Sequence, residues 1–535
     1  MNAPRKLIMK KSRSLLTFTV SLLLMAPVMS QDKIPGYDEI FDHEGKVREP
    51  YQRIVPIVEG MTPKKIEDFK TQTTQDFQGD NSLLHIPRVL TEEENRTLRQ
   101  GVEQRARTIS AFLQDHYSGK RLYEKAGIVS AQAIERIQSR ANEAHLNEKI
   151  TANHLAFWYG PDIIRGPDGK FKVIEDNLGF VGGFGDLLEA KNSLIRRNPA
   201  FQQAIVSPDP QAFYDNMVKS YRQRSQGGGK IVLLHYRGKD SSDNEEKRIR
   251  LIMENLGVET VPLKKKSKLS ETENFLKVEE DGVYLRNKDG KNEKVGMVIL
   301  DAEAVDVDPF NEKIFPQFII NEAKGNLEAL EESKAKGKKL SKKDLKDMAE
   351  LKRLLVTPHP KKILKYLNQA YSGYSKDDLK KLGVPGLLDA FYEGKVTVNN
   401  GPGFDFVGDK EMGLYMDQLT RFYLKEEPII QTLPTRSFGI KNKSGQVVLN
   451  QELMGEVYGK KAGTKDKYVV KRVDGRGGNA VWVGPKISQT EFESVIPAIQ
   501  EDPGAFIVQD YTPPFPNGWS YRGHSLSCGC TGGPF

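Results

Sequence analysis

Three side chains that carry oxygen ligands fall on one short segment, and their spacing suits a metal site. They are Asp162, Glu175 and Asn177. Residues 161–177 have the pattern of two strands around the turn Gly166-Pro-Asp-Gly169. Because side chains alternate between the faces of a strand, all three should project from one face. Two carboxylates and an amide oxygen are hard ligands for Mg²⁺, whose coordination phosphate oxygens and waters would complete.

The register of this hairpin decides how close the two carboxylates come. With Arg165 opposite Lys170, Asp162 lies opposite Val173, and Asp162 and Glu175 become diagonal neighbours. Diagonal neighbours lie about 7–8 Å apart at the backbone, so one ion would be within reach of both carboxylates. Taken alone, the pattern also fits an edge hairpin whose acidic side chains are merely solvated.

A second segment has the composition of a phosphate cradle. A strand at 467–471 ends in Lys471, the loop Asp474-Gly-Arg-Gly-Gly478 follows, and 480–483 has the pattern of a returning strand. A glycine-rich connection lets backbone N–H groups approach phosphate oxygens, and Lys471 would add a positive charge. The loop is not a P-loop, because no Gly-Lys-Ser/Thr follows and the next element is a strand. The segment also fits an ordinary glycine-rich hairpin.

A long helical pattern precedes the first of these segments. It covers 91–149 and starts with a capping box formed by Thr91 and Glu94. Its apolar residues have the spacing of one buried helix face, made by Leu98, Val102, Ile109 and Phe112.

The rest of the chain alternates between strand and helix patterns. Residues 227–262 predict a βαβ-like unit with its helix at 245–256. The stretch 321–353 is dominated by Lys, Glu and Ala, which predicts a solvated helical insertion. Residues 467–512 predict strands with one helix at 488–501.

Composition excludes several classes of protein. The 535 residues are 38% hydrophobic and 28% charged, which excludes a disordered chain and predicts two or three domains. Two cysteines, Cys528 and Cys530, exclude a disulfide scaffold, and the eight histidines show no metal-ligand spacing. The net charge of +8 is concentrated at the N-terminus and near 324–353, without the interleaved aromatic residues of a nucleic-acid binder. A mean hydropathy of −0.54 excludes a multi-span membrane protein.

The N-terminus has the pattern of a signal peptide. Basic residues between Arg5 and Arg13 precede a mostly apolar run from Leu15 to Val28, and a plausible cleavage site lies before Gln31. Export, most simply to a periplasm, is therefore expected, with no stable membrane span after cleavage. An uncleaved anchor or a chance apolar helix in a cytoplasmic protein are the alternatives.

Four motifs in sequence order resemble the circularly permuted ATP-grasp family, type 2, which is related to ligases of the glutathionylspermidine synthetase type. The first is Gly160-Pro-Asp162 with Asp168-Gly169 and Glu175-Asp-Asn-Leu178. The second is Asn400-Gly-Pro-Gly403 with Asp409-Lys410, and the third is the helix end Phe422-Tyr-Leu-Lys-Glu-Glu-Pro428. The fourth is Lys471-Arg-Val-Asp-Gly-Arg-Gly-Gly478, with Gln509 after it. The resemblance covers roughly residues 150–515.

The resemblance implies an α+β fold of the circularly permuted ATP-grasp type, with nucleotide between two halves. It implies that Asp162, Glu175 and Asn177 hold Mg²⁺, and that Lys410 and Lys471 contact ATP phosphates and act in catalysis. Further nucleotide contacts would come from Gly475, Gly477, Gly478 and Gln509. The implied reaction joins a small-molecule or peptide carboxylate to an amine through an acyl phosphate. An exported, non-catalytic binding protein on the same scaffold is the alternative.

The sequence departs from the family pattern at three places. After Asn177 it reads Leu178-Gly-Phe-Val-Gly-Gly183 where the family has Arg and Pro-Ser-Gly, and Asp301-Ala-Glu303 stands where an Arg-Arg pair is common. The residues after 515 lack the strand pattern of the family's end. We therefore expect a sheet without its closing strands, whose exposed edge makes 467–512 the least stable part of the chain.

These patterns divide the chain into eight segments. They are a signal peptide (1–30), a mainly helical N-terminal region (31–150), the metal-binding half (151–222), a βαβ-like pre-ATP-grasp subdomain (223–310), a Lys-rich insertion (311–355), a helical region with the Asp-Lys motif (356–440), a nucleotide lid half (441–515) and an irregular tail (516–535).

Overall fold

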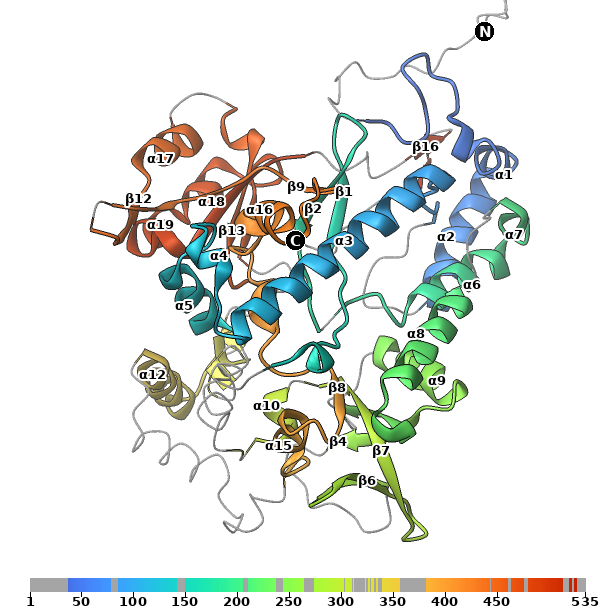
Figure 1. The fold of residues 1–535 in the computed structure, drawn as a ribbon. Helices are drawn as coiled ribbons and strands as arrows, with labels where there is room; N and C mark the ends of the chain where they lie inside the picture. Colours follow the sequence, from blue (N-terminus) through green and yellow to red (C-terminus); the bar gives the residue numbers. More distant parts are fainter. Residues whose placement is uncertain are drawn as a thin grey trace, which may run out of the picture. The chain divides into compact units, whose positions relative to one another are not determined.

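In the computed structural model, the largest sheet among the described residues has six strands, of which four run parallel (Figure 1). The parallel strands lie in the order β4-β3-β7-β8, and the β5–β6 hairpin joins them along the first half of β7. The strands are β3 (Lys230–Tyr236), β4 (Glu259–Leu263), β5 (Phe275–Glu279), β6 (Gly282–Arg286), β7 (Asn292–Asp301) and β8 (Thr397–Asn399).

The structure describes most of the chain between residues 37 and 526. The described residues are 37–77, 85–141, 150–179, 181–204, 210–236, 244–263, 274–302, 304–309, 311, 323, 326–327, 329–331, 333–334, 339–356, 382–442, 444–459, 463–475, 480–512, 519–521 and 524–526. Residues Gly36–Phe535 form one compact unit. The predicted signal peptide, part of the Lys-rich insertion (311–355), and Cys528 and Cys530 lie outside the described residues. Within those residues, no helix combines the length and apolar character needed to cross a membrane.

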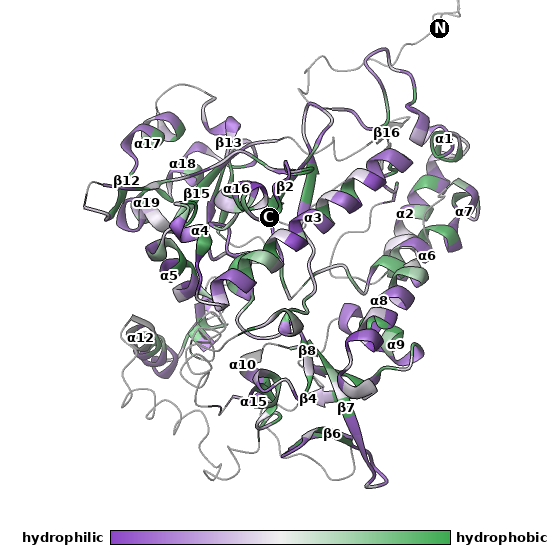
Figure 2. Ribbon diagram, viewed as in Figure 1, coloured by the Kyte–Doolittle hydropathy of each residue, from purple (hydrophilic) through white to green (hydrophobic). Residues whose placement is uncertain are grey.

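The predicted βαβ unit is confirmed. Strand β3 continues through α9 (Asn244–Asn255) into β4, and the two strands pair in parallel. Figure 2 shows the change along β7 from hydrophilic to hydrophobic residues, which matches its burial from exposed Asn292 to buried Asp301. A strand buried on both faces needs a nearly continuous apolar run, which the second half of β7 supplies.

The site hairpin forms as predicted, but its predicted register is wrong. Strands β1 (Asp162–Arg165) and β2 (Phe171–Glu175) pair with Arg165 opposite Phe171, and β2 also pairs in parallel with β9 (Gln431–Thr432). The turn from Gly166 has a left-handed glycine, Gly169 with φ of 77°, and Gly166 N–H donates to the Lys170 carbonyl at 2.7 Å. This glycine bulge adds one residue to the loop, which moves the pairs of Arg165, Ile164 and Ile163 by one position.

A second irregularity lies at the open end of the hairpin. The pairing shifts between Ile163 and Asp162, so that Asp162 lies opposite Glu175 rather than Val173. Ile174 is the extra residue of β2 at this shift. The two carboxylates are therefore direct rather than diagonal neighbours.

A four-stranded sheet, β10-β15-β13-β14, carries the glycine-rich loop. Its strands are β10 (Thr435–Ser437), β13 (Tyr468–Arg472), β14 (Val481–Val483) and β15 (Phe506–Asp510). Val470 and Val508 pack on one face against a core with Leu453, Phe492 and Ile499, which come from three helices. The helices are α17 (Gln451–Tyr458), α18 (Gln489–Glu493) and α19 (Ile496–Glu501).

Two details of this half differ from the sequence predictions. The single helix predicted at 488–501 is two, because Pro497 in the first turn of α19 lacks an N–H and its ring excludes a continuous helix from α18. The tail, for which no strands were predicted, contains the pair β16 (Trp519–Tyr521) and β17 (His524–Leu526). Strand β15 pairs on both sides, so it is not an edge. The expected low stability of 467–512 stays a prediction.

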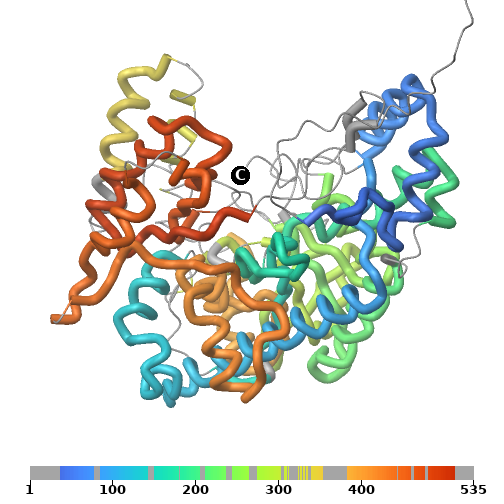
Figure 3. The backbone as a smooth tube through the Cα atoms, turned by 90° about the horizontal axis from the view of Figure 1, so that it is seen from above, coloured from blue at the N-terminus to red at the C-terminus, as the bar shows by residue number. Residues whose placement is uncertain are grey.

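Helices of the N-terminal region contact later parts of the chain. Helix α3 (Glu92–Tyr117) begins with the predicted capping box of Thr91 and Glu94. It runs beside α16 (Gly413–Leu424) (Figure 3). The Thr108 and Thr420 hydroxyls, one on each helix, lie 3.1 Å apart. Of its predicted buried face, Ile109 and Phe112 are buried, whereas Leu98 and Val102 are half-buried. Helices α4 (Leu122–Lys125) and α5 (Ala131–Arg140) follow.

The described residues also form further helices and one further hairpin. They are α1 (Val55–Glu59), α2 (Pro63–Phe77), α6 (Leu187–Arg197), α7 (Ala200–Ala204), α8 (Pro210–Arg224), α10 (Ala304–Val307), α12 (Lys342–Val356), α15 (Leu387–Tyr392), and the strands β11 (Gly439–Lys441) and β12 (Val447–Leu449).

Candidate functional site

The open end of the β1–β2 hairpin brings the three predicted metal ligands together. Asp162 and Glu175 are cross-strand partners, and side chains in such pairs lie about 4.5–5.5 Å apart at Cβ. Asn177, two residues beyond Glu175, donates from Nδ2 to Asp162 Oδ1 at 3.2 Å and to the Gly160 carbonyl at 3.1 Å. The bulge thus brings the carboxylates closer than the sequence predicted.

Lys410 connects this hairpin to the glycine-rich loop. Its Nζ donates to Glu175 Oε1 at 2.7 Å and also to the carbonyl of Gly475. Its backbone N–H donates to the Val473 carbonyl at 3.1 Å. The side chain is 5% exposed, so this contact is a buried ion pair at the junction of the two sheets.

Lys471 lies on the face of β13 that is turned away from the core. Val470 packs in the core, so strand alternation directs Lys471 to the opposite face, towards Glu175 and Asp162. Burial, together with the charge of Lys410, lowers the pKa of Lys471 to about 8, although Glu175 and Asp162 act in the other direction. Lys471 is buried as a residue, and its charge interacts with both carboxylates and with Lys410, an arrangement that suits an anionic ligand.

The pKa of Asp162 is raised, whereas that of Lys471 is lowered. The residue is open to solvent on one side, yet the surrounding protein partly desolvates its carboxylate and raises its pKa to about 6. The negative charge of Glu175 raises it further, while Lys471 and Lys410 oppose the shift. Perturbed carboxylate and lysine pKa values in one place are typical of functional sites.

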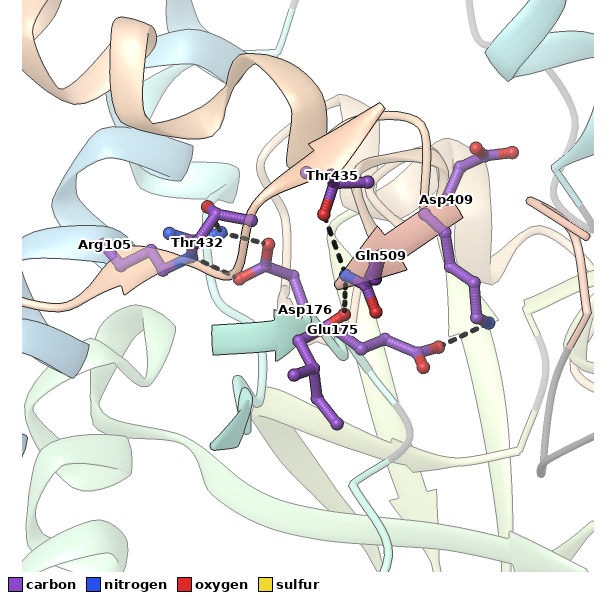
Figure 4. A pocket seen from close by; sticks show the side chains of 10 residues that line it. Arg105, Glu175, Asp176, Asp409, Thr432, Thr435 and Gln509 are labelled. Atoms are coloured by element: carbon purple, nitrogen blue, oxygen red, sulfur yellow. Dashed lines mark hydrogen bonds and ion pairs between the residues drawn. The ribbon is translucent and has the colours of Figure 1, made fainter. Parts of the chain in front are cut away.

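Gln509 lies on the same face of its sheet as Lys471. Its Nε2 donates to the Ile174 carbonyl at 3.2 Å and to Thr435 Oγ1 at 2.9 Å, and these residues line a small pocket with Glu175 and Lys410. Figure 4 shows Glu175 and Asp176 turned in opposite directions from β2. Of the predicted glycines, Gly475 contacts Lys410, whereas Gly477 and Gly478 lie outside the described residues.

Two arginine–aspartate ion pairs around the site escaped the sequence analysis. Arg105 of α3 donates to both oxygens of Asp176, at 2.6 and 2.8 Å. Arg140 of α5 donates to both oxygens of Asp409, at 2.8 and 3.1 Å. Each aspartate adjoins a predicted site residue, which was the only signal in the sequence.

The donor set suits a hard cation, although it is small. Among the described residues, no group of three or more His, Cys, Asp or Glu side chains is arranged to hold a metal ion. The hairpin offers two carboxylates and one amide, which leaves positions for phosphate oxygens and water. This fits a cation that arrives with a phosphorylated ligand better than a resident structural metal.

A lysine-bearing sheet with a glycine-rich loop, facing strands that carry carboxylates, defines a protein of the ATP-grasp class. The family model described as circularly permuted ATP-grasp type 2 matches residues 87–314 and 363–514. The chain therefore belongs to this family, which confirms the resemblance and the fold class predicted from the sequence. Proteins of the family generally use ATP and Mg²⁺.

Several curated proteins are similar along most of the chain. The protein of Frankia alni named "Putative glutamate--cysteine ligase 2-3" is 24% identical over 91% of this chain and 48% of its own length. An uncharacterized protein of Synechocystis is 22% identical over 89% of this chain and 84% of its own. The chain spans about half the length of the Frankia relatives that it matches. A solved glutathione synthetase-like effector of Globodera pallida is 10% identical, with a TM-score of 0.42 over 84% of this chain and 81% of its own.

Proposed function

We propose that the protein is an ATP-grasp ligase that joins a carboxylate to an amine with Mg²⁺ and ATP. The observation that carries the proposal is the convergence of two carboxylates, Asp162 and Glu175, with two buried lysines, Lys410 and Lys471. Phosphoryl transfer needs this combination, because charge that builds on the transferred group must be neutralised.

Each side chain has a part in this proposal. Asp162, Glu175 and Asn177 would hold Mg²⁺, which supplies charge neutralisation at the phosphates. Lys471, whose ammonium already lies buried beside the carboxylates, would bind phosphate oxygens directly. Lys410 pairs with Glu175 in this structure, so it would exchange that partner for phosphate when the cation arrives. Gln509 would line the nucleotide pocket.

The substrates we propose are a small-molecule or peptide carboxylate and an amine. Names of the Frankia relatives support an amino-acid ligase, at low identity. The alternative, an exported binding protein without turnover, is favoured by the basic and apolar N-terminal pattern. Release of ADP and phosphate that depends on added amino acids separates the two, since a binding protein releases neither.

The Glu175→Gln variant should bind Mg²⁺-ATP at least about tenfold more weakly than the parent chain. The substitution keeps the shape of the side chain but removes one charge that faces the cation, and a few ångströms from an ion one charge is worth more than 1.4 kcal/mol. Isothermal titration calorimetry of both proteins with Mg²⁺-ATP measures the change.

Asp168→Asn is the matched control. Asp168 lies in the turn at the other end of the same hairpin, is exposed, and loses the same single charge. Its affinity for Mg²⁺-ATP should equal that of the parent chain. Unchanged binding in Glu175→Gln, beside normal binding in the parent, would overturn the metal assignment.

The affinity for Mg²⁺-ATP should be greatest near pH 7. Asp162, with its pKa raised to about 6, becomes protonated as the pH falls through 6 and then no longer attracts the cation. Lys471, with its pKa lowered to about 8, loses its charge as the pH rises through 8 and then no longer attracts phosphate. Titrations from pH 5.5 to 9.5 at saturating Mg²⁺ measure both limbs. A profile that stays flat up to pH 9.5 would exclude Lys471 as the phosphate-binding cation.

A further inference from the structure

The two chain neighbours of Lys410, Asp409 and Glu411, are buried carboxylates, and both accept hydrogen bonds from helix α5. Asp409 accepts hydrogen bonds from Arg140 Nε and Nη2 at 2.8 and 3.1 Å, and Glu411 accepts from Arg140 Nη2 at 2.7 Å. Arg136, one turn earlier on α5, also donates to Glu411. One arginine therefore holds both chain neighbours of the site lysine.

The network has equal numbers of positive and negative charges and is mostly buried, with the Arg136 side chain 25% exposed. Two arginines face two carboxylates, and the Arg140, Asp409 and Glu411 side chains are 13%, 6% and 3% exposed. Bidentate arginine–carboxylate pairs fix geometry as well as charge, because the planar donors match the two oxygens. The carboxylates are thereby neutralised locally and do not repel an anion at Lys410.

Hydrogen bonds also fix the backbone on both sides of Lys410. Asp409 Oδ1 accepts from the Glu411 N–H at 2.9 Å, and the Asp409 carbonyl accepts from the Met412 N–H at 2.8 Å. On the other side, the Lys410 N–H donates to the Val473 carbonyl at 3.1 Å. Asp409 and Glu411 are thus directed to α5, while Lys410 is directed to Glu175 on β2.

We propose that Arg140 is a positioning residue of the nucleotide site: by holding Asp409 and Glu411 it places Lys410 between the hairpin and the glycine-rich loop. This inference rests on the proposed function, because it assumes that Lys410 contacts ATP phosphates. It makes the N-terminal helical region part of the site through the support that α5 gives to the neighbours of Lys410. A lysine side chain loses considerable rotamer entropy when it is held, so a fixed backbone lowers the cost of its phosphate contact.

A double-mutant cycle tests whether Arg140 acts through Lys410. The four proteins are the parent chain, Arg140→Met, Lys410→Met and the double variant, each titrated with Mg²⁺-ATP by calorimetry. Arg140→Met alone should weaken binding about tenfold. In the Lys410→Met background the same change should alter affinity by less than about twofold, because its target is gone. Asp409→Asn, which keeps the shape of the aspartate, should follow Arg140→Met and covers the case in which the arginine variant fails to fold.

Arg421→Met is the matched control, because Arg421 lies on α16 and its ion pair with Glu427 is exposed. It should leave affinity unchanged. Equal losses from Arg140→Met in both backgrounds would show a general structural role and overturn the proposal, as would no loss in either. A parent chain that does not bind Mg²⁺-ATP would refute the proposed function itself, which is a distinct result.

Discussion

The free energy of unfolding of the Arg105→Met variant should be about 3–5 kcal/mol lower than that of the parent chain. This is the cost of leaving one partner of a buried ion pair without the other. Arg105 and Asp176 are each 4% exposed in their side chains, and two hydrogen bonds join them. Methionine fills most of the space of the arginine stem. Among the described residues it leaves the Asp176 carboxylate with one hydrogen bond, from the Tyr159 hydroxyl at 2.7 Å. Urea denaturation followed by circular dichroism measures the loss.

The electrostatics of the pair explain the size of this effect. Burial alone would lower the pKa of Arg105, but the charge and hydrogen bonds of Asp176 outweigh it and raise the pKa. Arg107→Met is the control on the same helix, since the Arg107–Glu426 pair is 48% and 40% exposed and should contribute less than about 1 kcal/mol. Similar losses of unfolding free energy in both variants would show that the buried Arg105–Asp176 pair stabilises the fold no more than the exposed Arg107–Glu426 pair.

The site hairpin and the glycine-rich loop could be predicted because each has a short local pattern, whereas Lys410 and Gln509 were expected as site residues only from the family resemblance. A turn sequence between two alternating stretches predicts a hairpin, and the glycine-rich loop next to Lys471 predicts close backbone approach. The exact pairing of Asp162 with Glu175 could not be predicted, because two bulges set it. One depends on the left-handed Gly169 and the other on an extra residue, Ile174, which no sequence rule fixes.

The supporting arginines could not be predicted for a different reason. On α3, Gln104, Arg105 and Thr108 continue the stripe of Ile109 and Phe112, yet polar residues on a helix are normally solvated. Their burial depends on partners more than 70 positions away, Asp176 and Thr432 for Arg105. Only the fold brings such partners together, and the same holds for Arg140 with Asp409.

The Lys471→Met variant should lose Mg²⁺-ATP binding by about 10- to 150-fold without losing stability. A charged hydrogen bond to phosphate contributes about 1.5–3 kcal/mol, and the methionine side chain cannot make one. In the ligand-free protein, however, burial makes the ammonium costly, as its lowered pKa of about 8 indicates. Methionine removes that cost and keeps the packing of an unbranched side chain.

The sign of the pH dependence separates this explanation from simple damage to the sheet. Below pH 8 Lys471 is charged in both states, and the parent chain bears the full cost of the buried charge. As the pH rises from about 8 towards 10.5, the folded lysine releases its proton before the unfolded one, so the parent chain gains stability relative to Lys471→Met. Thermal unfolding at pH 7 and pH 10, with the exposed Lys467→Met as control, measures this difference. A variant that is less stable than the parent chain at pH 7 would mean that Lys471 supports the sheet, and its loss of binding would then say nothing about phosphate.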